Sequence, residues 1–221
     1  MQTFDTPAPI SAVLDVPAGR VQVIAADRAD TTIEVLPADA SKGRDVKVAE
    51  QARVEFADGV LRIETPAKNQ FMGPAGSVEV TLRLPSGSRV EARTAAAEFR
   101  GVGRLGDVGY EGAQGPVKLD EAASVRLTTS AGDITIGRLG GPAEIRTEKG
   151  DIRITEAAGG EVVLRTRSGD ISVGAATGVC AALDSGTGFG RVHNALRNTD
   201  GTPALTIHAT TDHGDITARS L

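Results

Sequence analysis

The most regular pattern in the chain is an alternation of apolar and polar residues that recurs after a glycine. The clear copies are GDITI at 132–136, GDIRI at 150–154, GDISV at 169–173 and GDITA at 214–218, with looser copies from Ala97, Gly115 and Gly190. Successive copies begin 18, 17, 18, 19, 21 and 24 residues apart. Alternate residues of a strand face one side, so the Ile and Val positions are predicted to face inward. Self-similarity at a period of about 20 residues predicts a solenoid.

A second strand precedes each glycine and repeats equally well. Its copies are VEART at 90–94, VRLTT at 125–129, AEIRT at 143–147 and VVLRT at 162–166. One repeat is therefore a strand of about five residues, a tight turn, a strand of about three residues and a loop. Stacked repeats pair each strand with its counterpart about 4.8 Å away, in parallel and in register.

Two columns of residues are expected to fix this register. The first is a threonine column whose stacked hydroxyls can hydrogen-bond along the axis, at Thr94, Thr129, Thr147 and Thr166. The second is the glycine column, which permits positive φ at the corner. Between them, Leu127, Ile145 and Leu164 should stack in the core, with Ile134, Ile152 and Ile171 facing them.

The first part of the chain is rich in strands but less repetitive. Strands are predicted at 11–16, 20–24, 31–36, 52–56, 60–64 and 77–84, with loops at 68–76 and 194–203 and no helix. This part is either a wider start of the solenoid or a β-layer packed on its first coil. The fold class is thus all-β: one domain over 1–221, a right-handed parallel β-solenoid with irregular N-terminal strands at 1–89 and about seven regular coils at 90–221.

The composition and charge of the chain limit the kinds of core, partner and cellular location that we expect. With 27 Gly, no Trp, one Tyr and five Phe, the core must be thin. A net charge of −5 without a basic run argues against a nucleic-acid partner. Cys180 is the single cysteine, which excludes an intrachain disulfide and suits a reducing compartment. The first residues have no leader pattern and no stretch approaches the ~20 apolar residues of a membrane span, so a cytoplasmic location is expected.

Three features of the sequence resemble those of a known family. They are the repeated Gly-Asp-Ile phrase, the Leu-x-Thr that precedes it, and the Val-Pro-Ala-Gly turn at 16–19 near the start of the chain. The whole chain resembles the bacterial β-strand-repeat family called putative adhesin, a domain of unknown function. The resemblance implies a β-solenoid. It brings no agreed catalytic residues to this sequence.

The aspartates of the four clear copies are the strongest candidates for a site. They form the structural repeat turns Gly132-Asp133, Gly150-Asp151, Gly169-Asp170 and Gly214-Asp215. A column of carboxylates about 5 Å apart could bind calcium, because Ca²⁺ takes six to eight oxygen ligands. Calcium-binding β-rolls, however, use a nine-residue repeat, half the period found here. The favoured interpretation is that each Asp accepts hydrogen bonds from N–H groups of its own turn, without a metal.

Other polar residues suggest weaker sites. Arg146 and Arg165 share a column that could bind an anion or an acidic sugar, although a solvated surface is the simpler interpretation, and Glu148 should pair with Arg167 across coils. His193, His208 and His213 are too far apart to form a metal site by local spacing, with His208 expected to face solvent and His213 to lie in a turn. Cys180 is expected to be a small hydrophobe rather than a nucleophile.

These observations favour a protein that is not an enzyme and that needs no cofactor or metal. The predicted role is a structural scaffold or protein-interaction solenoid, adhesin-like, with an unidentified protein partner. One alternative is a self-assembling, cytoskeleton-like element, joined through solenoid ends left open after the last repeat at 214–218 unless the insertion at 194–203 covers them. The other alternative is a carbohydrate-binding or carbohydrate-active β-helix protein, for which the chain has few aromatic rings.

Overall fold

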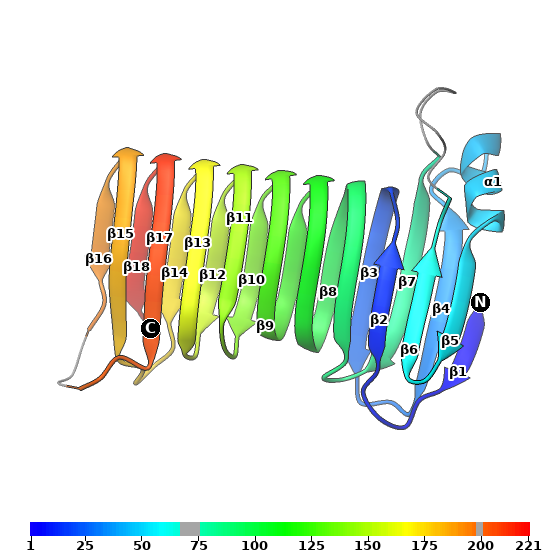
Figure 1. The fold of residues 1–221 in the computed structure, drawn as a ribbon, viewed down its shortest axis with the longest axis horizontal. Coiled ribbons are helices and arrows are strands. Elements are labelled where there is room, and N and C mark those ends of the chain that lie inside the picture. Colours follow the sequence, from blue (N-terminus) through cyan, green and yellow to red (C-terminus); the bar gives the residue numbers. More distant parts are fainter. Residues whose placement is uncertain (67–75, 198–200) are drawn as a thin grey trace. The chain divides into compact units, whose positions relative to one another are not determined.

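A computed structural model describes residues 1–66, 76–197 and 201–221 (Figure 1). Its contacts divide the chain into two compact units, Met1–Gly115 and Pro116–Leu221, which are described separately. The predicted all-β solenoid fold class is confirmed in both units by stacked strands, whereas the prediction of one domain over the whole chain stays a prediction. Most of the loop predicted at 68–76 lies outside the described residues, as does the centre of the loop predicted at 194–203. No helix in the described residues has the length and hydrophobicity to cross a bilayer.

The second unit is built from parallel strands on two sides of a thin core. Its strands are β9 (Val117–Ala131), β10 (Ile134–Leu139), β11 (Ala143–Lys149), β12 (Ile152–Ala157), β13 (Gly160–Ser168), β14 (Ile171–Ala175), β15 (Ala181–Phe189), β16 (Val192–Ala195), β17 (Leu205–His213) and β18 (Ile216–Ser220). One side has the order β9, β10, β12, β14, β18, β16. The other has the order β9, β11, β13, β17, β15.

The core columns lie where the sequence predicts them. Leu127, Ile145 and Leu164 are in register and completely buried. The facing column of Ile134, Ile152 and Ile171 is also in register, with at most 1% of any of them exposed. Burial of alternate residues on both sides therefore defines a core only two side chains thick, as the shortage of aromatic residues implies.

The order of the coils differs from the order of the repeats. The chain passes from β14 to β15 and β16, then turns back so that β17 and β18 fill the positions between them and the β13–β14 coil. The expectation that the last repeat, 214–218, forms the last coil is therefore wrong. The coil formed by β15 and β16 is instead the outermost coil of the second unit, beyond β17 and β18 (Figure 1). We call it the terminal coil.

The first unit uses the same out-of-order stacking. Its elements are β1 (Gln2–Asp5), β2 (Ser11–Asp15), β3 (Ala18–Ala26), β4 (Asp30–Pro37), α1 (Gly43–Glu50), β5 (Arg53–Ala57), β6 (Val60–Glu64), β7 (Val78–Pro85) and β8 (Arg89–Gln114). β2 pairs in parallel with both β6 and β8, and β3 pairs in parallel with both β7 and β8. The coil of β2 and β3 comes first in the sequence but therefore lies between the coil of β6 and β7 and the coil of β8. β4 pairs antiparallel with β7 and β1, and β5 pairs antiparallel with β6. Both interpretations of this region, irregular coils and an added β-layer, are thus partly correct.

The end of β8 forms a further coil above its own beginning. The Gly106 N–H donates to the carbonyl of Ser88 at 2.9 Å, and Arg93 forms an ion pair with Glu111 at 3.4 Å. The Tyr110 hydroxyl hydrogen-bonds to Thr94 at 2.8 Å. Burial raises the pKa of the Tyr110 phenol above its usual value, although the hydrogen bond to Thr94 acts in the opposite direction.

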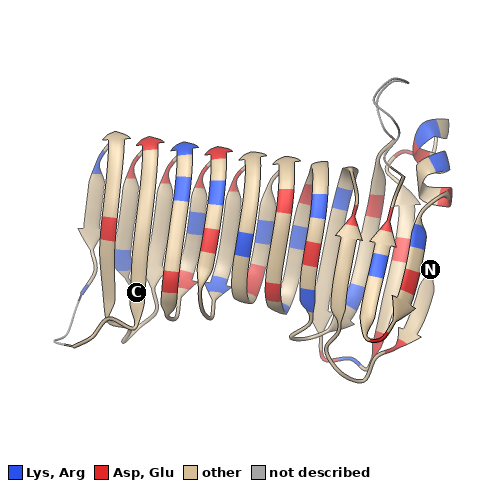
Figure 2. Ribbon diagram, in the orientation of Figure 1, with Lys and Arg blue, Asp and Glu red and all other residues tan. Residues whose placement is uncertain are grey.

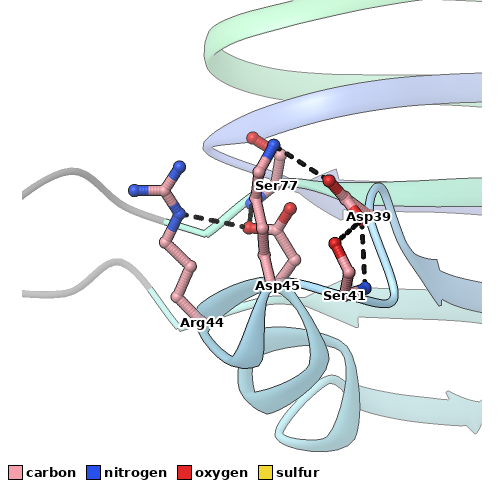
Figure 3. Close-up of polar contacts among 6 residues, drawn as sticks. Asp39, Ser41, Arg44, Asp45 and Ser77 are labelled. Atoms are coloured by element: carbon pink, nitrogen blue, oxygen red, sulfur yellow. Dashed lines mark hydrogen bonds and ion pairs between the residues drawn. The ribbon is translucent and has the colours of Figure 1, made fainter.

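The helix α1 was not predicted, because its eight residues are too few for a periodic signal and its N-cap, Lys42, makes no side-chain cap. Tertiary contacts hold it instead (Figure 3). The carboxylate of Asp45, only 3% exposed, accepts the Ser77 N–H at 3.0 Å and lies 3.6 Å from the guanidinium of Arg44. In the preceding turn, hydrogen bonds from Ser41 and Lys42 lower the pKa of Asp39 to about 2.

The alternation in β12 can be tested by chemical denaturation of two neighbouring variants. Ile152→Ala should lower the free energy of unfolding by ~2–5 kcal/mol, because it leaves a cavity in the completely buried column. Arg153→Ala, on the exposed face of the same strand, should change it by less than about 0.5 kcal/mol. Equal losses from both variants would contradict the assignment of the two faces.

Candidate functional site

The corner glycines stack with almost no space between coils. Gly150 has φ 140°, and a Cβ built on it would lie 2.3 Å from the carbonyl oxygen of Gly132. Gly169 and Gly214 repeat this approach to the preceding corner at 2.1 and 2.0 Å. A side chain is excluded here twice, by the positive φ and by the neighbouring backbone.

The aspartates after these glycines connect each coil to the next one. The Asp151 N–H donates to the carboxylate of Asp133 at 3.0 Å, and the Asp170 N–H donates to that of Asp151 at 2.8 Å. The Asp215 N–H donates to the carboxylate of Asp170 at 2.7 Å. The sequence led us to expect donors from each residue's own turn, but the donors belong to the neighbouring coil. We call this series of hydrogen bonds the corner ladder.

The threonine column supports the same corners but not through a chain of hydroxyls. Thr166 donates to the Gly150 carbonyl at 3.1 Å, and Thr211 donates to the Gly169 carbonyl at 3.0 Å. The prediction that hydroxyls bond one another along the column is therefore wrong at these positions. At the corners of Gly150 and Gly169, one coil thus offers a carbonyl and a carboxylate, and the next coil supplies the hydroxyl and the N–H. Thr147 differs, because its hydroxyl donates to the Lys149 carbonyl of its own strand at 3.3 Å.

The calcium interpretation of the aspartate column finds no support in this geometry. The carboxylates of Asp133, Asp151 and Asp170 each already accept a backbone N–H from the next coil. Across residues 1–66, 76–197 and 201–221, no group of three or more His, Cys, Asp or Glu side chains is arranged to hold a metal ion.

The corner ladder stops at the terminal coil. The Arg191 N–H donates to the carboxylate of Asp215 at 2.8 Å, so the terminal coil supplies the donor of the last bond in the ladder. The corner Gly190 also stacks on Gly214, with 2.0 Å between an added Cβ and the Gly214 carbonyl oxygen. Arg191, however, stands where the four clear copies have Asp. The terminal coil therefore presents no carboxylate at this position to a further coil.

The terminal coil also exposes apolar side chains. Phe189 is 73% exposed and Val192 45% exposed, which makes them two of the five large hydrophobic residues that are exposed in the described part of the chain. The Phe189 ring stacks on His213 of the neighbouring strand, with 5.0 Å between centroids and 7° between planes. The ring is thus held in place while most of its surface remains accessible.

A second feature lies on the outer face of β13, β17 and β15. His208 lies between two carboxylates, with Nδ1 3.2 Å from Asp184 and Nε2 3.9 Å from Glu161. These residues and Arg165 line an open depression of about 510 Å³. The repeat pattern does not predict this cluster, because β17 lies between β13 and β15 only through the out-of-order stacking.

Arg146 and Arg165 are partners in the register of β11 and β13, as the shared column predicts. Arg146 pairs with Glu144 on its own strand at 2.6 Å. Glu148 and Arg167 are in register, but no ion pair joins them in the described residues, so the expected pairing is wrong. His193 is exposed on β16, and Cys180 is half-buried and forms no disulfide within the chain.

Both signs of charge are spread along the outer faces of the strands (Figure 2). Several exposed charges pair between neighbouring strands, as in Arg126 with Glu144 and Arg138 with Glu156, each at 3.5 Å. Exposed pairs of this kind contribute little to stability. They leave the outer faces without a large field of a single sign.

The model of the Toastrack DUF4097 family matches residues 13–219, nearly the whole chain. The chain belongs to the Toastrack DUF4097 family. This match over nearly the whole chain confirms the family resemblance that the repeated phrase carries. The stacked strands of both units are the architecture of this Toastrack protein.

Solved structures that are similar to this Toastrack chain have low sequence identity to it. A putative adhesin from Bacteroides fragilis is 13% identical with a TM-score of 0.56, over 98% of this chain and 95% of that one. A putative cell adhesion protein from Clostridium sporogenes is 10% identical with a TM-score of 0.45, over 100% and 98% of the two chains. No curated protein matches in sequence. The Bacteroides structure shows the fold alone.

The corner glycines should be far less tolerant than a glycine of the terminal coil. Gly150→Ala should cost at least about 2 kcal/mol of unfolding free energy, since both φ and the Gly132 carbonyl oppose a Cβ. Gly186→Ala should change it by less than about 0.5 kcal/mol, because an added Cβ meets nothing within 4 Å. Denaturant unfolding of both variants checks this, and a tolerated alanine at Gly150 would contradict the stacking.

The corner ladder predicts different effects for two changes at Asp151. Asp151→Ala leaves the Asp170 N–H without its acceptor and should cost about 1–2 kcal/mol. Asp151→Asn should cost less, because the amide oxygen can still accept this N–H. Melting curves of both variants, with and without millimolar calcium, provide the measurement. A wild-type melting temperature raised by many degrees in calcium and lowered by chelator would instead support a metal site.

Proposed function

We propose that this Toastrack protein is a non-catalytic, adhesin-like scaffold that binds a protein partner at its terminal coil. The observation that carries the proposal is the outer edge of β15 from Ala182 to Phe189. In the described residues β15 pairs with β17 alone, and β16 pairs with β18 alone. An unpaired strand edge beside exposed apolar side chains is a template for a strand supplied by another chain.

The composition of the terminal coil supports this role. Edge strands of monomeric proteins are usually protected by lysines, prolines or bulges. Residues 181–195 contain no Lys and no Pro, and their only charged residues are Asp184 and Arg191. The exposed ring of Phe189 adds an aromatic side chain of the kind that contributes most to protein interfaces.

The use of the repeated side chains favours a scaffold over an enzyme. Glycine, aspartate and threonine at the corners make hydrogen bonds between coils, and these bonds occupy the groups that recur most regularly. A carbohydrate-binding role has less support, because sugar sites use exposed aromatic platforms. The rings of Phe99 and Tyr110 are buried and pack on each other at 5.3 Å, and Phe189 alone is aromatic among the large exposed hydrophobic residues of the described chain.

Photo-cross-linking in cells that produce the protein tests this function. A photoreactive phenylalanine analogue replaces Phe189 in one variant and Arg153, on the exposed face of β12, in a matched control. We expect a cross-linked protein adduct from position 189 and much less from position 153. Mass spectrometry then identifies the adduct. Adducts from position 153 alone would contradict binding at the terminal coil.

A further inference from the structure

We propose that the partner at the terminal coil is a second copy of this chain, joined through antiparallel pairing of the two β15 strands about a two-fold axis. This inference rests on the proposed function, because it names the occupant of the same edge. A two-fold axis perpendicular to both the solenoid axis and the strands brings the two β15 edges together in antiparallel orientation. The pairing would continue the β13, β17, β15 side from one copy into the other.

The end of the corner ladder favours this arrangement over a further parallel coil. Every Asp coil of the second unit holds the next coil through a carboxylate that accepts a corner N–H. At the terminal coil this position is Arg191, whose side chain cannot accept a hydrogen bond. A head-to-tail coil would therefore lack the device that fixes register inside the solenoid. An antiparallel strand needs no corner contact, because its bonds run between strands only.

The side chains of β15 are compatible with their own two-fold image. Pairing centred on Ser185 preserves the inward and outward alternation, since residues equally far from the axis have the same orientation. Leu183 then lies opposite Thr187 of the second copy, and Asp184 lies opposite Gly186. Like charges do not meet, and Gly186 has open space above its Cα, so no side chain obstructs the approach.

This register makes the charge at position 186 a specific test. An added side chain at Gly186 fits the single chain, because nothing lies within 4 Å of its Cβ and its φ is not positive. Gly186→Glu would place a carboxylate opposite Asp184 of the second copy, and the two-fold axis repeats this contact. Gly186→Lys would place an ammonium group there instead. Opposite signs of charge should therefore change dimerisation in opposite directions.

Sedimentation equilibrium of the full chain at several concentrations measures the dimer dissociation constant. We expect Gly186→Glu to raise it about fivefold or more and Gly186→Lys to lower it, because each charge acts in two symmetric contacts. Gly43→Glu, at another open glycine without positive φ, should leave it unchanged. A wild-type chain that stays monomeric at high concentration would overturn the proposal, as would equal effects of Glu and Lys.

A cross-link across the axis gives an independent measurement. In a Cys180→Ala background, Ser185→Cys should form a disulfide between two copies under mild oxidation, because directly opposite residues of antiparallel strands lie about 4.5–5.5 Å apart at Cα. Thr135→Cys on β10 provides the control and should remain monomeric on a non-reducing gel. Equal cross-linking at both positions would overturn the register.

The two proposals fail in different ways. If the adduct from position 189 contains only a different protein and the purified chain is monomeric, the second-copy inference is wrong while the binding function of the terminal coil stands. If position 189 gives no adduct in cells, the proposed function fails, whatever the purified chain does. An adduct of two copies of this chain supports both.

Discussion

The close contact between successive corners is the constraint on which the second unit depends. Glycine at each corner lets one backbone approach the next, and the aspartate beside it offers its carboxylate to an N–H of the adjoining coil. A thin core of Ile, Leu and Val cannot fix the axial register of the strands alone, because neighbouring positions in such columns are nearly equivalent. The corner ladder removes this ambiguity from the Asp133 coil to the terminal coil, since a charged acceptor and a fixed donor meet in only one register.

The same constraint explains how the chain can depart from sequential order. Each corner recognises the next through local chemistry, so a coil can be placed wherever the connecting loops can reach. The coil of β17 and β18 therefore fits between the β13–β14 coil and the terminal coil. Its Asp215 N–H donates to Asp170 on one side, and its Asp215 carboxylate accepts the Arg191 N–H on the other. In the first unit, a comparable departure from sequential order places β2 between β6 and β8, and β3 between β7 and β8.

The two units manage their outermost strands differently. In the first unit, antiparallel strands and α1 are added to the parallel coils, and a buried Asp45 fixes the helix to the backbone before β7. In the second unit, the terminal coil interrupts the ladder with Arg191 and exposes Phe189. A protein that uses its repeated residues to build itself has few of them left for recognition. The exception to the repeat is therefore the natural place to look for a partner.

The repeat itself was sufficient to predict the stacked fold, the corner glycines and the buried columns through Ile145 and Ile152, because each is a local consequence of strand alternation and a fixed period. Tertiary structure decided what depends on which coils become neighbours. The sequence predicted neither that Asp carboxylates bind the next coil, nor that Thr166 donates to a glycine carbonyl, nor that α1 forms, since these contacts join residues distant in sequence. The position of the terminal coil and the meeting of His208 with Asp184 and Glu161 likewise depend on the path of the loops. The period fixes how neighbours stack, but it does not specify which repeat is the neighbour.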